Sequence, residues 1–489
     1  MPEDSGADSR ADSTARPPRG ARTGRPMLWS AIESLSLALV SFAMLAMLAR
    51  YLDASTFGKA AIALGIVQIA CSLAESFFHD AVVQRGDLRD GDIDAAHTAS
   101  VLIALVLAAG IALNAVLAGP RGLGQDTEIA RLALWMAPSI LLTGWCAMTI
   151  ASMRRTLATR ELALASAGSR FAAGLLGLLL LSRGFGVWAL VVQQNFSLLL
   201  LFVLLRCVRA PAPRLTTNLA GARRLAAFAA VNSVYGLLNT NMSRIFQLLC
   251  GLVMPASVVG QVSLALRLVD MLVSVMVTGV ARVTMPRLAA ASHAGLGVSA
   301  GFLSATRNFC IVTMPVLVLM AALAHPLVQL VGHDGWSEAA VLVMWFALAQ
   351  ALRSPTFLST TLFASLGKPQ VNLFVSVVEL ATLALLTWLL HDPLAWIARL
   401  AVVLPLVAWL MWQQAGIGSW QLLRSVRESL FAALVMGAAL AWALPSLGWQ
   451  RLPPILALLA AGLAGTLIYA TLASLLLMRR GPSHSVNTP

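Results

Sequence analysis

Apolar stretches of about 20 residues follow one another from Trp29 to Met478, and short polar loops separate them. Because about 20 helical residues cross the hydrocarbon core, and because backbone polar groups in lipid need partners within their own segment, each stretch predicts a transmembrane helix. We therefore expect an all-α polytopic membrane protein with about 14 such helices. The predicted spans are residues 28–49, 57–78, 98–118, 131–152, 162–181, 187–206, 226–251, 258–280, 306–331, 338–363, 371–390, 394–413, 429–445 and 453–477.

This pattern divides the chain into four parts. Residues 1–26 are rich in Ser, Asp, Arg, Pro and Gly, and predict a disordered tail without a cleavable secretory signal. Residues 27–210 and 211–413 each hold six predicted helices, and residues 414–489 add two more helices and a second tail. We expect two pseudo-symmetric six-helix bundles followed by two C-terminal helices.

An internal repeat supports the two bundles. Residues 52–68 (LDASTFGKAAIALGIVQ) align with residues 254–270 (MPASVVGQVSLALRLVD) at an offset of 202. Identities include Ala54/Ala256 and Gly58/Gly260, and both copies lie where the chain enters the second helix of a half. A chance match between Ala-rich and Leu-rich helices is the alternative. Transporters built from repeated halves place the substrate between them.

The composition excludes a soluble domain. Hydrophobic residues make up 59% of the chain and charged residues 11%, and the mean hydropathy is +0.81. A soluble core cannot bury that much apolar surface. Five cysteines, Cys71, Cys146, Cys207, Cys250 and Cys310, lie singly in or at the ends of apolar spans, so they predict neither disulfides nor a metal site.

Successive loops carry alternately many and few basic residues. Of the loop lysines and arginines, 22 lie on the side of the N-terminus and six on the other side. The positive-inside rule therefore places both termini in the cytoplasm and requires an even number of spans. The formal charge of +13 is spread along membrane edges, which argues against a nucleic-acid-binding surface.

Catalytic signatures are absent from the sequence. No GxxxxGK[ST] phosphate-binding loop occurs, and no external loop is long enough to hold a catalytic pair. A membrane-embedded glycosyltransferase would be expected to carry such a loop. We therefore expect a transporter without a cofactor, not an enzyme.

Several motifs resemble those of the polysaccharide-biosynthesis flippases in the multidrug/oligosaccharidyl-lipid/polysaccharide exporter superfamily. They are LDASTFG at 52–58, VVQRGDL at 82–88, LLNTNMSRIFQLLCG at 237–251, GQVSLALRL at 260–268, TMPRL at 284–288 and LFASLGKPQ at 362–370. The resemblance covers roughly residues 28–390. One departure is that Phe246 and Gln247 stand where the family often has Asp-Asn, so no role of that Asp is carried over.

This resemblance implies translocation of undecaprenyl-diphosphate-linked oligosaccharide across a bacterial inner membrane, for exopolysaccharide, capsule or O-antigen synthesis. A polysaccharide polymerase and glycosyltransferases are then candidate partners, together with membrane lipids. The alternative within the superfamily is a cation-coupled multidrug antiporter. A cation site should be rich in inward-facing acids, whereas this chain places arginines in mid-bundle.

Basic residues within the predicted spans are candidates for binding the cargo, because a charge in the membrane is costly and guanidinium forms paired hydrogen bonds to phosphate. Arg244 has no acid within one turn, and Arg353 precedes Ser354-Pro355, where we expect a kink. Arg267 is either a third candidate for binding the cargo or the partner of Asp270, three residues later on the same helix face. Packing, or pairing with Glu33, Glu75 or Glu379, is the alternative for Arg244 and Arg267.

Other polar residues in the spans complete the predicted site. Asn241 and Gln247 would bind sugar hydroxyls or tie helices together. Glu33, Glu75 and Asp270 are candidates for coupling transport to an ion gradient, because burial raises a carboxylate pKa. Arg307 and Arg399 lie near span ends, where we expect their side chains to reach the interface.

Overall fold

The structure is a computed structural model that describes residues 40–446 and 453–478, except 86, 90, 118–126, 209, 211 and 294–297. Within these residues the regular structure is helical throughout. A short apolar helix, Val40–Tyr51, comes first. The helices that follow are α2 (Ala54–Gln84), α3 (Asp92–Leu117), α4 (Thr127–Arg155), α5 (Thr159–Ser182), α6 (Trp188–Cys207), α7 (Ala220–Val253), α8 (Ala256–His293), α9 (Val298–Ala322), α10 (Ala324–Val331), η2 (Asp334–Trp336), α11 (Ser337–Arg353), η3 (Ser354–Thr356), α12 (Ser359–Ser365), α13 (Pro369–Leu390), α14 (Ala395–Ala398), α15 (Leu400–Ala415), α16 (Ser419–Ser446) and α17 (Pro454–Met478).

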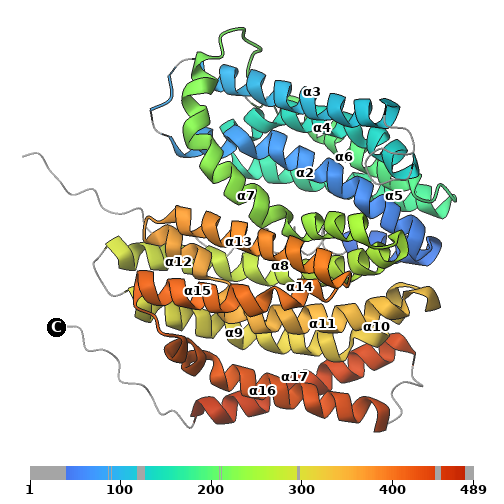
Figure 1. Cartoon of the computed structure of the whole chain (residues 1–489), viewed down its shortest axis with the longest axis vertical. Coiled ribbons are helices and arrows are strands. Elements are labelled where there is room, and N and C mark those ends of the chain that lie inside the picture. Colours follow the sequence, from blue (N-terminus) through green and yellow to red (C-terminus); the bar gives the residue numbers. More distant parts are fainter. Residues whose placement is uncertain are drawn as a thin grey trace, which may run out of the picture.

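The helices are stacked in two groups (Figure 1). Helices α2 to α6 form the upper group, which we call the first lobe, and α8 to α15 form the second lobe. Helix α7 joins them, because it packs against α2 and α3 on one side and against α13 on the other. Helices α16 and α17 lie along the outer edge of the second lobe (Figure 1).

Twelve helices in the described part of the chain are long and apolar enough to cross a membrane. Helix α7 matches the predicted span 226–251 but is not among the twelve. The predicted span 28–49 lies mostly outside the described residues, as does the expected disordered tail at 1–26. A polytopic helical membrane protein is thus confirmed, while the number 14 stays a prediction.

Three predicted spans are interrupted. The span at 338–363 divides into α11, η3 and α12 around Pro355, which confirms the expected kink. The span at 306–331 divides at Leu323 into α9 and α10. The span at 394–413 divides at Arg399 into α14 and α15. At Leu323 and Arg399 the backbone N–H groups still bond to the carbonyls four residues earlier, so the helical path continues through both interruptions.

The internal repeat has a direct structural counterpart. Helix α2 begins at Ala54 and α8 begins at Ala256, as the offset of 202 requires. A Cβ placed on Gly58 would lie 1.8 Å from the carbonyl oxygen of Ala256, and one placed on Gly260 would lie 1.9 Å from that of Ala54. The two helices therefore cross in reciprocal backbone contact, which only glycine permits.

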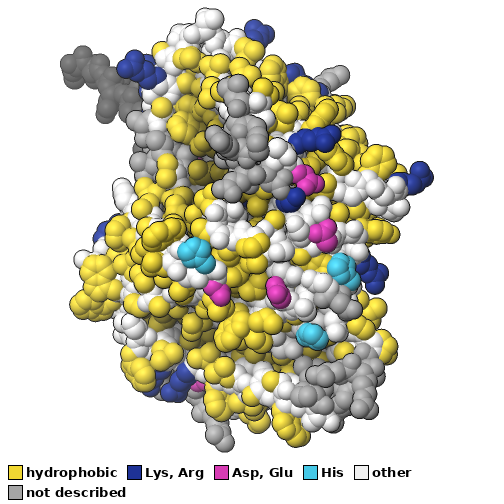
Figure 2. All heavy atoms as spheres, turned by 45° about the vertical axis from the view of Figure 1, so that its right-hand side comes forward, with side chains coloured by type: hydrophobic (Ala, Val, Ile, Leu, Met, Phe, Trp, Pro, Cys, Tyr) yellow, Lys and Arg dark blue, Asp and Glu magenta, His cyan; other side chains and the backbone are white. Residues whose placement is uncertain are grey.

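Polar and apolar side chains are separated on the surface. Figure 2 brings forward the end of the bundle where the α2–α8 crossing lies, and shows acidic and histidine side chains in the middle of this end, with apolar side chains around them. Many large apolar side chains on the helix flanks are exposed, including Leu105, Val106, Trp135, Leu199 and Trp388. Exposed apolar flanks of this kind fit contact with lipid.

The start of α2 depends on one cap. The carboxylate of Asp53 accepts hydrogen bonds from the backbone N–H groups of Ser55 and Thr56, both at 3.1 Å. Hydrogen bonding to Thr56 lowers the pKa of this carboxyl, so the cap stays charged at neutral pH. We expect Asp53→Ala to destabilise the protein by about 1 kcal/mol in a detergent unfolding measurement, whereas Asp53→Asn keeps most of the cap. Equal loss in both variants would contradict the cap.

Candidate functional site

A cavity of about 1410 Å³ lies between the two lobes. The helix Val40–Tyr51, α2, α5 and α6 line it from the first lobe, α7 and α8 line its middle, and α11 to α15 line the opposite wall. The volume exceeds the 300–1,000 Å³ range that is typical of pockets for drug-sized ligands. The cavity is therefore large enough for a multi-ring polar ligand.

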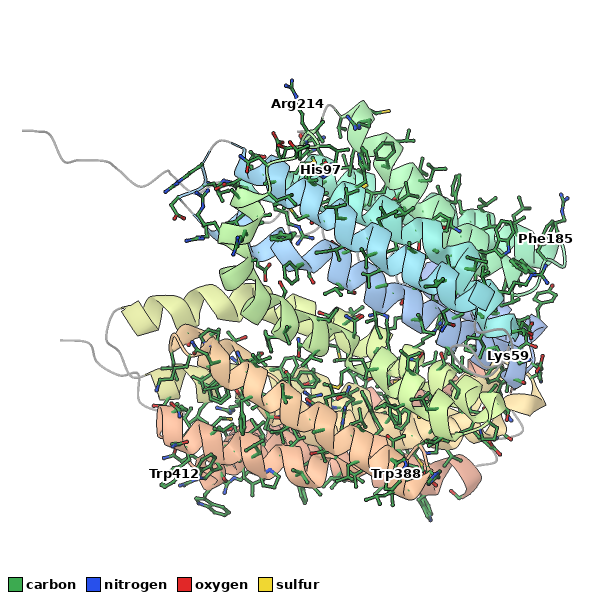
Figure 3. The ribbon with its side chains drawn as sticks, turned by 45° about the horizontal axis from the view of Figure 1, so that its top comes forward. Lys59, His97, Phe185, Arg214, Trp388 and Trp412 are labelled. Carbon is green, nitrogen blue, oxygen red and sulfur yellow. The ribbon has the colours of Figure 1, made fainter. Side chains whose placement is uncertain are left out.

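One end of the cavity is closed. In Figure 3 the ribbons of the lobes meet at the end that holds Lys59 and stand apart at the opposite end. At the Lys59 end the Trp336 indole N–H donates to the Ala49 carbonyl at 2.7 Å, and the Phe57 and Trp336 rings meet edge to face at 5.3 Å. Gln261 also bonds to the Gly335 carbonyl and the Ala339 N–H. The Trp336 contacts join the lobes beside the α2–α8 crossing, and the Gln261 bonds hold the Trp336 segment against α8 within the second lobe.

Arg244 projects from α7 into the cavity. Its Nε donates to Gln68 Oε1 at 2.5 Å, and its Nη1 donates to Asn241 Oδ1 at 2.9 Å. Asn241 is fully buried and also accepts a hydrogen bond from Ser72 at 3.3 Å. Predicted as a substrate ligand, Asn241 instead lies behind Arg244 and holds its guanidinium in place. Gln247, one turn further along α7, does line the cavity.

Arg267 lines the cavity near its closed end. Its guanidinium carbon lies 5.3 Å from the centre of the Phe57 ring, close enough for a cation–π interaction. Of the two alternatives for Arg267, pairing with Asp270 is not found: both residues are described, and no ion pair within 4 Å joins them. Asp270 also lines the cavity, where its side chain interacts with that of Ser243.

Arg353 and Arg399 share one buried carboxylate. Arg353 Nη2 lies 3.4 Å from Glu379 Oε2, and Arg399 Nη1 lies 3.1 Å from Glu379 Oε1. Arg399 is 1% exposed, and its guanidinium stacks at 3.3 Å on the Trp396 ring. The expectation that Arg399 reaches the interface is wrong, because its side chain is buried against Glu379 and Trp396. Arg307 is the other arginine whose side chain we expect at the interface. It is about one-third exposed, and its Nη2 lies 3.9 Å from Glu428 Oε2.

The predicted coupling carboxylates are not all at this site. Asp270 lines the cavity, whereas Glu75 on α2 is not among the described residues that do so. Glu33 lies outside the described residues. No cluster of three or more His, Cys, Asp or Glu suited to a metal ion occurs within the described part of the chain.

Sequence reasoning missed several polar contributors to the cavity wall, among them Gln68, Arg170 and Gln193. Gln68 could have been found, because it is the repeat counterpart of Asp270 at the offset of 202. Arg170 and Gln193 carry no comparable signal beyond being polar within apolar spans.

The charged residues that line the cavity determine its net charge. Among the described lining residues there are four arginines, Arg170, Arg244, Arg267 and Arg353, and two carboxylates, Asp270 and Glu379. Glu379 is further neutralised by Arg399 behind the wall. The cavity is therefore net positive, and guanidinium groups suit carboxylate or phosphate oxygens.

Comparison with known proteins agrees with this architecture. The family model for polysaccharide biosynthesis proteins matches residues 47–341, more than half of the chain. The succinoglycan biosynthesis transport protein ExoT of Rhizobium meliloti (strain 1021) is 23% identical over 457 residues, which span 91% of this chain and 91% of that protein.

Two solved structures share the fold. Lipid II flippase MurJ, in an inward closed conformation, matches with a TM-score of 0.68 at 13% identity, over 92% of this chain and 99% of that one. A multidrug resistance MATE family transporter of the MOP superfamily, in an inward-facing conformation, matches with a TM-score of 0.59 at 12% identity, over 84% of this chain and 98% of that one. The extent of the family match confirms the resemblance of the motifs: the chain belongs to the family of polysaccharide biosynthesis proteins.

Proposed function

We propose that this protein is a flippase that moves undecaprenyl-diphosphate-linked oligosaccharide from the cytoplasmic to the periplasmic leaflet of a bacterial inner membrane, for exopolysaccharide, capsule or O-antigen synthesis. The observation that carries the proposal is the large, net positive cavity between two pseudo-symmetric lobes. Family membership and similarity to a succinoglycan biosynthesis transport protein support it.

Different cavity residues would bind the diphosphate and the sugars of the cargo. The diphosphate carries negative charge through a low-dielectric barrier, so it needs fixed positive charge along its route. Arg244 and Arg267 on neighbouring helices are the proposed diphosphate ligands, with Arg353 on the opposite wall. Gln247 and Gln68 supply amide groups for sugar hydroxyls.

Movement of the two lobes would carry the cargo across. Residues 27–210 and 211–413 are the proposed moving halves, with both termini in the cytoplasm, and alternating access follows from rocking one half against the other. With that orientation the closed end, at Lys59, is periplasmic, and this conformation accepts cargo from the cytoplasm. A polysaccharide polymerase and glycosyltransferases stay candidate partners.

Among the coupling candidates, Asp270 is the best placed. It lines the same cavity as the arginines, so a proton or cation bound there would alter the affinity for the anionic cargo. Glu33 and Glu75 stay candidates for coupling at a distance from the cavity wall.

A cation-coupled multidrug antiporter is the competing function, because the MATE fold is shared. It is less well supported, since a cation site needs unpaired acids. In this cavity Glu379 contacts two arginines, and Asp270 shares the cavity with four.

A double variant tests the proposal. We expect Arg244→Gln with Arg267→Gln to lower flux of the lipid-linked cargo about tenfold or more, because each replacement removes a charge-assisted hydrogen bond. Flux is measured as cargo that becomes accessible to an external glycosidase in proteoliposomes, and by complementation of a flippase-deficient strain.

The matched control is Arg183→Gln, which removes an exposed arginine at the end of α5, outside the cavity. The control should keep parental flux. Parental flux in the double variant would contradict the role of these arginines, and export of organic cations without flux of lipid-linked cargo would favour the antiporter.

A further inference from the structure

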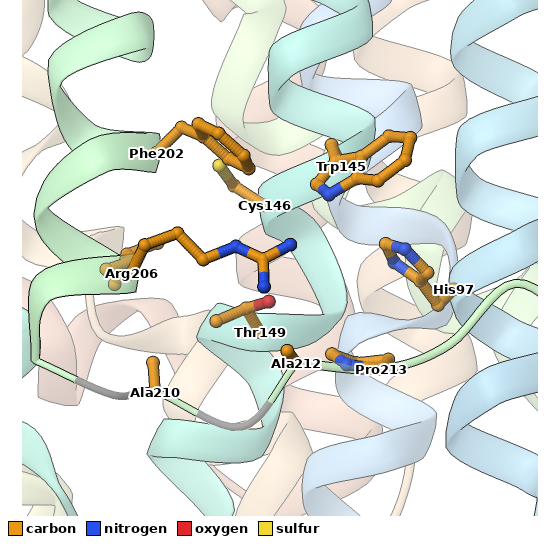
Figure 4. Close-up of a pocket in the computed structure, with 10 residues that line it drawn as sticks. His97, Trp145, Cys146, Thr149, Phe202, Arg206, Ala210, Ala212 and Pro213 are labelled. Atoms are coloured by element: carbon orange, nitrogen blue, oxygen red, sulfur yellow. The ribbon is translucent and has the colours of Figure 1, made fainter.

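A second recess lies on the outer face of the first lobe, between α3 and α6 and over α4 (Figure 4). His97 comes from α3, Trp145, Cys146 and Thr149 come from α4, and Arg206 comes from α6. Ala210, Ala212 and Pro213 lie below it (Figure 4). None of the residues that line it lines the central cavity, so the recess is a separate feature.

His97 is the most informative residue of this recess. Its side chain is 1% exposed, and within the described part of the chain neither Nδ1 nor Nε2 has a hydrogen-bond partner. Its ring meets the Trp145 ring edge to face at 5.5 Å, which orients the imidazole but satisfies no nitrogen. Burying a polar group without a partner is costly, so a ligand atom between His97 and its neighbours would relieve that cost.

Arg206 supplies the charge. It lies in the last turn of α6, its guanidinium carbon is 5.4 Å from the Phe202 ring centre, and it points across the recess toward His97 (Figure 4). No carboxylate of the described residues lies within 4 Å of it. The nearby Asp94 carboxylate accepts a hydrogen bond from the Arg214 backbone N–H at 2.8 Å. The Arg206 guanidinium is thus free to bind an anion.

The surroundings of the recess indicate which kind of anion it would bind. Arg206 stands where α6 leaves the apolar span, at the level of lipid head groups. Further into the membrane on the same two helices, Leu102 of α3 and Val203 of α6 are exposed. A ligand with a phosphate at one end and acyl chains at the other matches this order, and basic pockets between transmembrane helices commonly bind anionic lipids.

We propose that this recess is a binding site for the phosphate of an anionic phospholipid, with Arg206 as the charged ligand and His97 and Thr149 as hydrogen-bonding groups. The empty space of the recess is about 300 Å³ when the open solvent at its mouth is included, but the volume that a water-sized group can occupy is only about 10 Å³. The recess therefore holds about one water-sized group. One phosphate oxygen enters between Arg206 and His97, and the rest of the head group stays outside the recess. Because α6 leads directly into the connection to α7, an occupied site would fix the first lobe to the bilayer.

Native mass spectrometry of the full-length protein tests the site. The protein is released from detergent micelles in the presence of phosphatidylglycerol or phosphatidylcholine, and retained lipid is counted. We expect phosphatidylglycerol to be retained over phosphatidylcholine, and Arg206→Gln to weaken that retention about tenfold. Arg206→Lys should keep part of it, and His97→Phe should weaken it without removing the charge.

The matched control is Arg214→Gln, which removes an arginine that projects outward from the same surface (Figure 3). It should retain phosphatidylglycerol like the parent, and all variants should unfold at the parental temperature without lipid. Equal retention of the two lipids, or parental retention by Arg206→Gln, would overturn the proposal. Displacement of phosphatidylglycerol by inorganic phosphate would assign the site to a free anion and overturn its assignment to a lipid.

Discussion

Replacing Gly58 by leucine is expected to abolish transport and to lower the thermal stability of the purified protein. Even a Cβ at this position would lie 1.8 Å from the Ala256 carbonyl oxygen, and that atom belongs to helix backbone and cannot turn aside. The variant must therefore push α2 away from α8, at a cost of about 1–3 kcal/mol or more for overpacking. Gly260→Leu should act in the same way, because it meets the Ala54 carbonyl across the same crossing.

The measurements are thermal unfolding in detergent and flux in proteoliposomes. Gly110→Leu on α3 is the matched control, because it changes a helical glycine in the same way at an exposed position with open space around it. Since Gly58 and Gly260 share one contact, the double variant should cost less than the two single costs added together. A Gly58→Leu protein with parental stability and flux would show that the crossing is not tight.

Glu379→Gln should destabilise the protein by about 3–5 kcal/mol, because it leaves buried positive charge without its partner. Arg399 is 1% exposed and Glu379 is the carboxylate that contacts it, at 3.1 Å. Arg399→Met should cost less, since Glu379 keeps Arg353 at 3.4 Å. Combining the two replacements should recover part of the loss, as in a double-mutant cycle.

Thermal unfolding in detergent reports these differences. Glu338→Gln is the matched control, because it neutralises an exposed glutamate in the first turn of α11. If Glu379→Gln unfolded at the same temperature as the control, the ion pairs would not stabilise the protein. If the double variant lost as much stability as the two single variants together, Glu379 and Arg399 would act independently.

Features that depend on local pattern could be predicted from the sequence. The apolar stretches locate the membrane helices, Pro355 predicts the interruption after α11, and the repeat predicts that α2 and α8 start 202 residues apart. The repeat also pairs Gln68 with Asp270, and both line the cavity. Periodicity and proline carry these predictions because each acts through its own few residues.

Features that depend on which way a side chain points could not be predicted. Arg267 and Asp270 share a helix face by spacing, yet Arg267 lies over Phe57 and Asp270 faces Ser243. Arg399 lies near the end of a predicted span, yet it is buried in contact with Glu379 of α13. In each case a residue distant in the chain is the partner, and spacing along one helix does not encode it.

The amino-acid sequence by itself determined that this chain is a polytopic helical membrane protein of a polysaccharide biosynthesis family, because hydrophobic length, basic-residue asymmetry and short motifs are properties of consecutive residues. Only the tertiary structure decided which arginines face the central cavity, which share Glu379, and how closely α2 approaches α8. Those outcomes depend on helix rotation and crossing distance, which are set by packing between segments up to hundreds of residues apart.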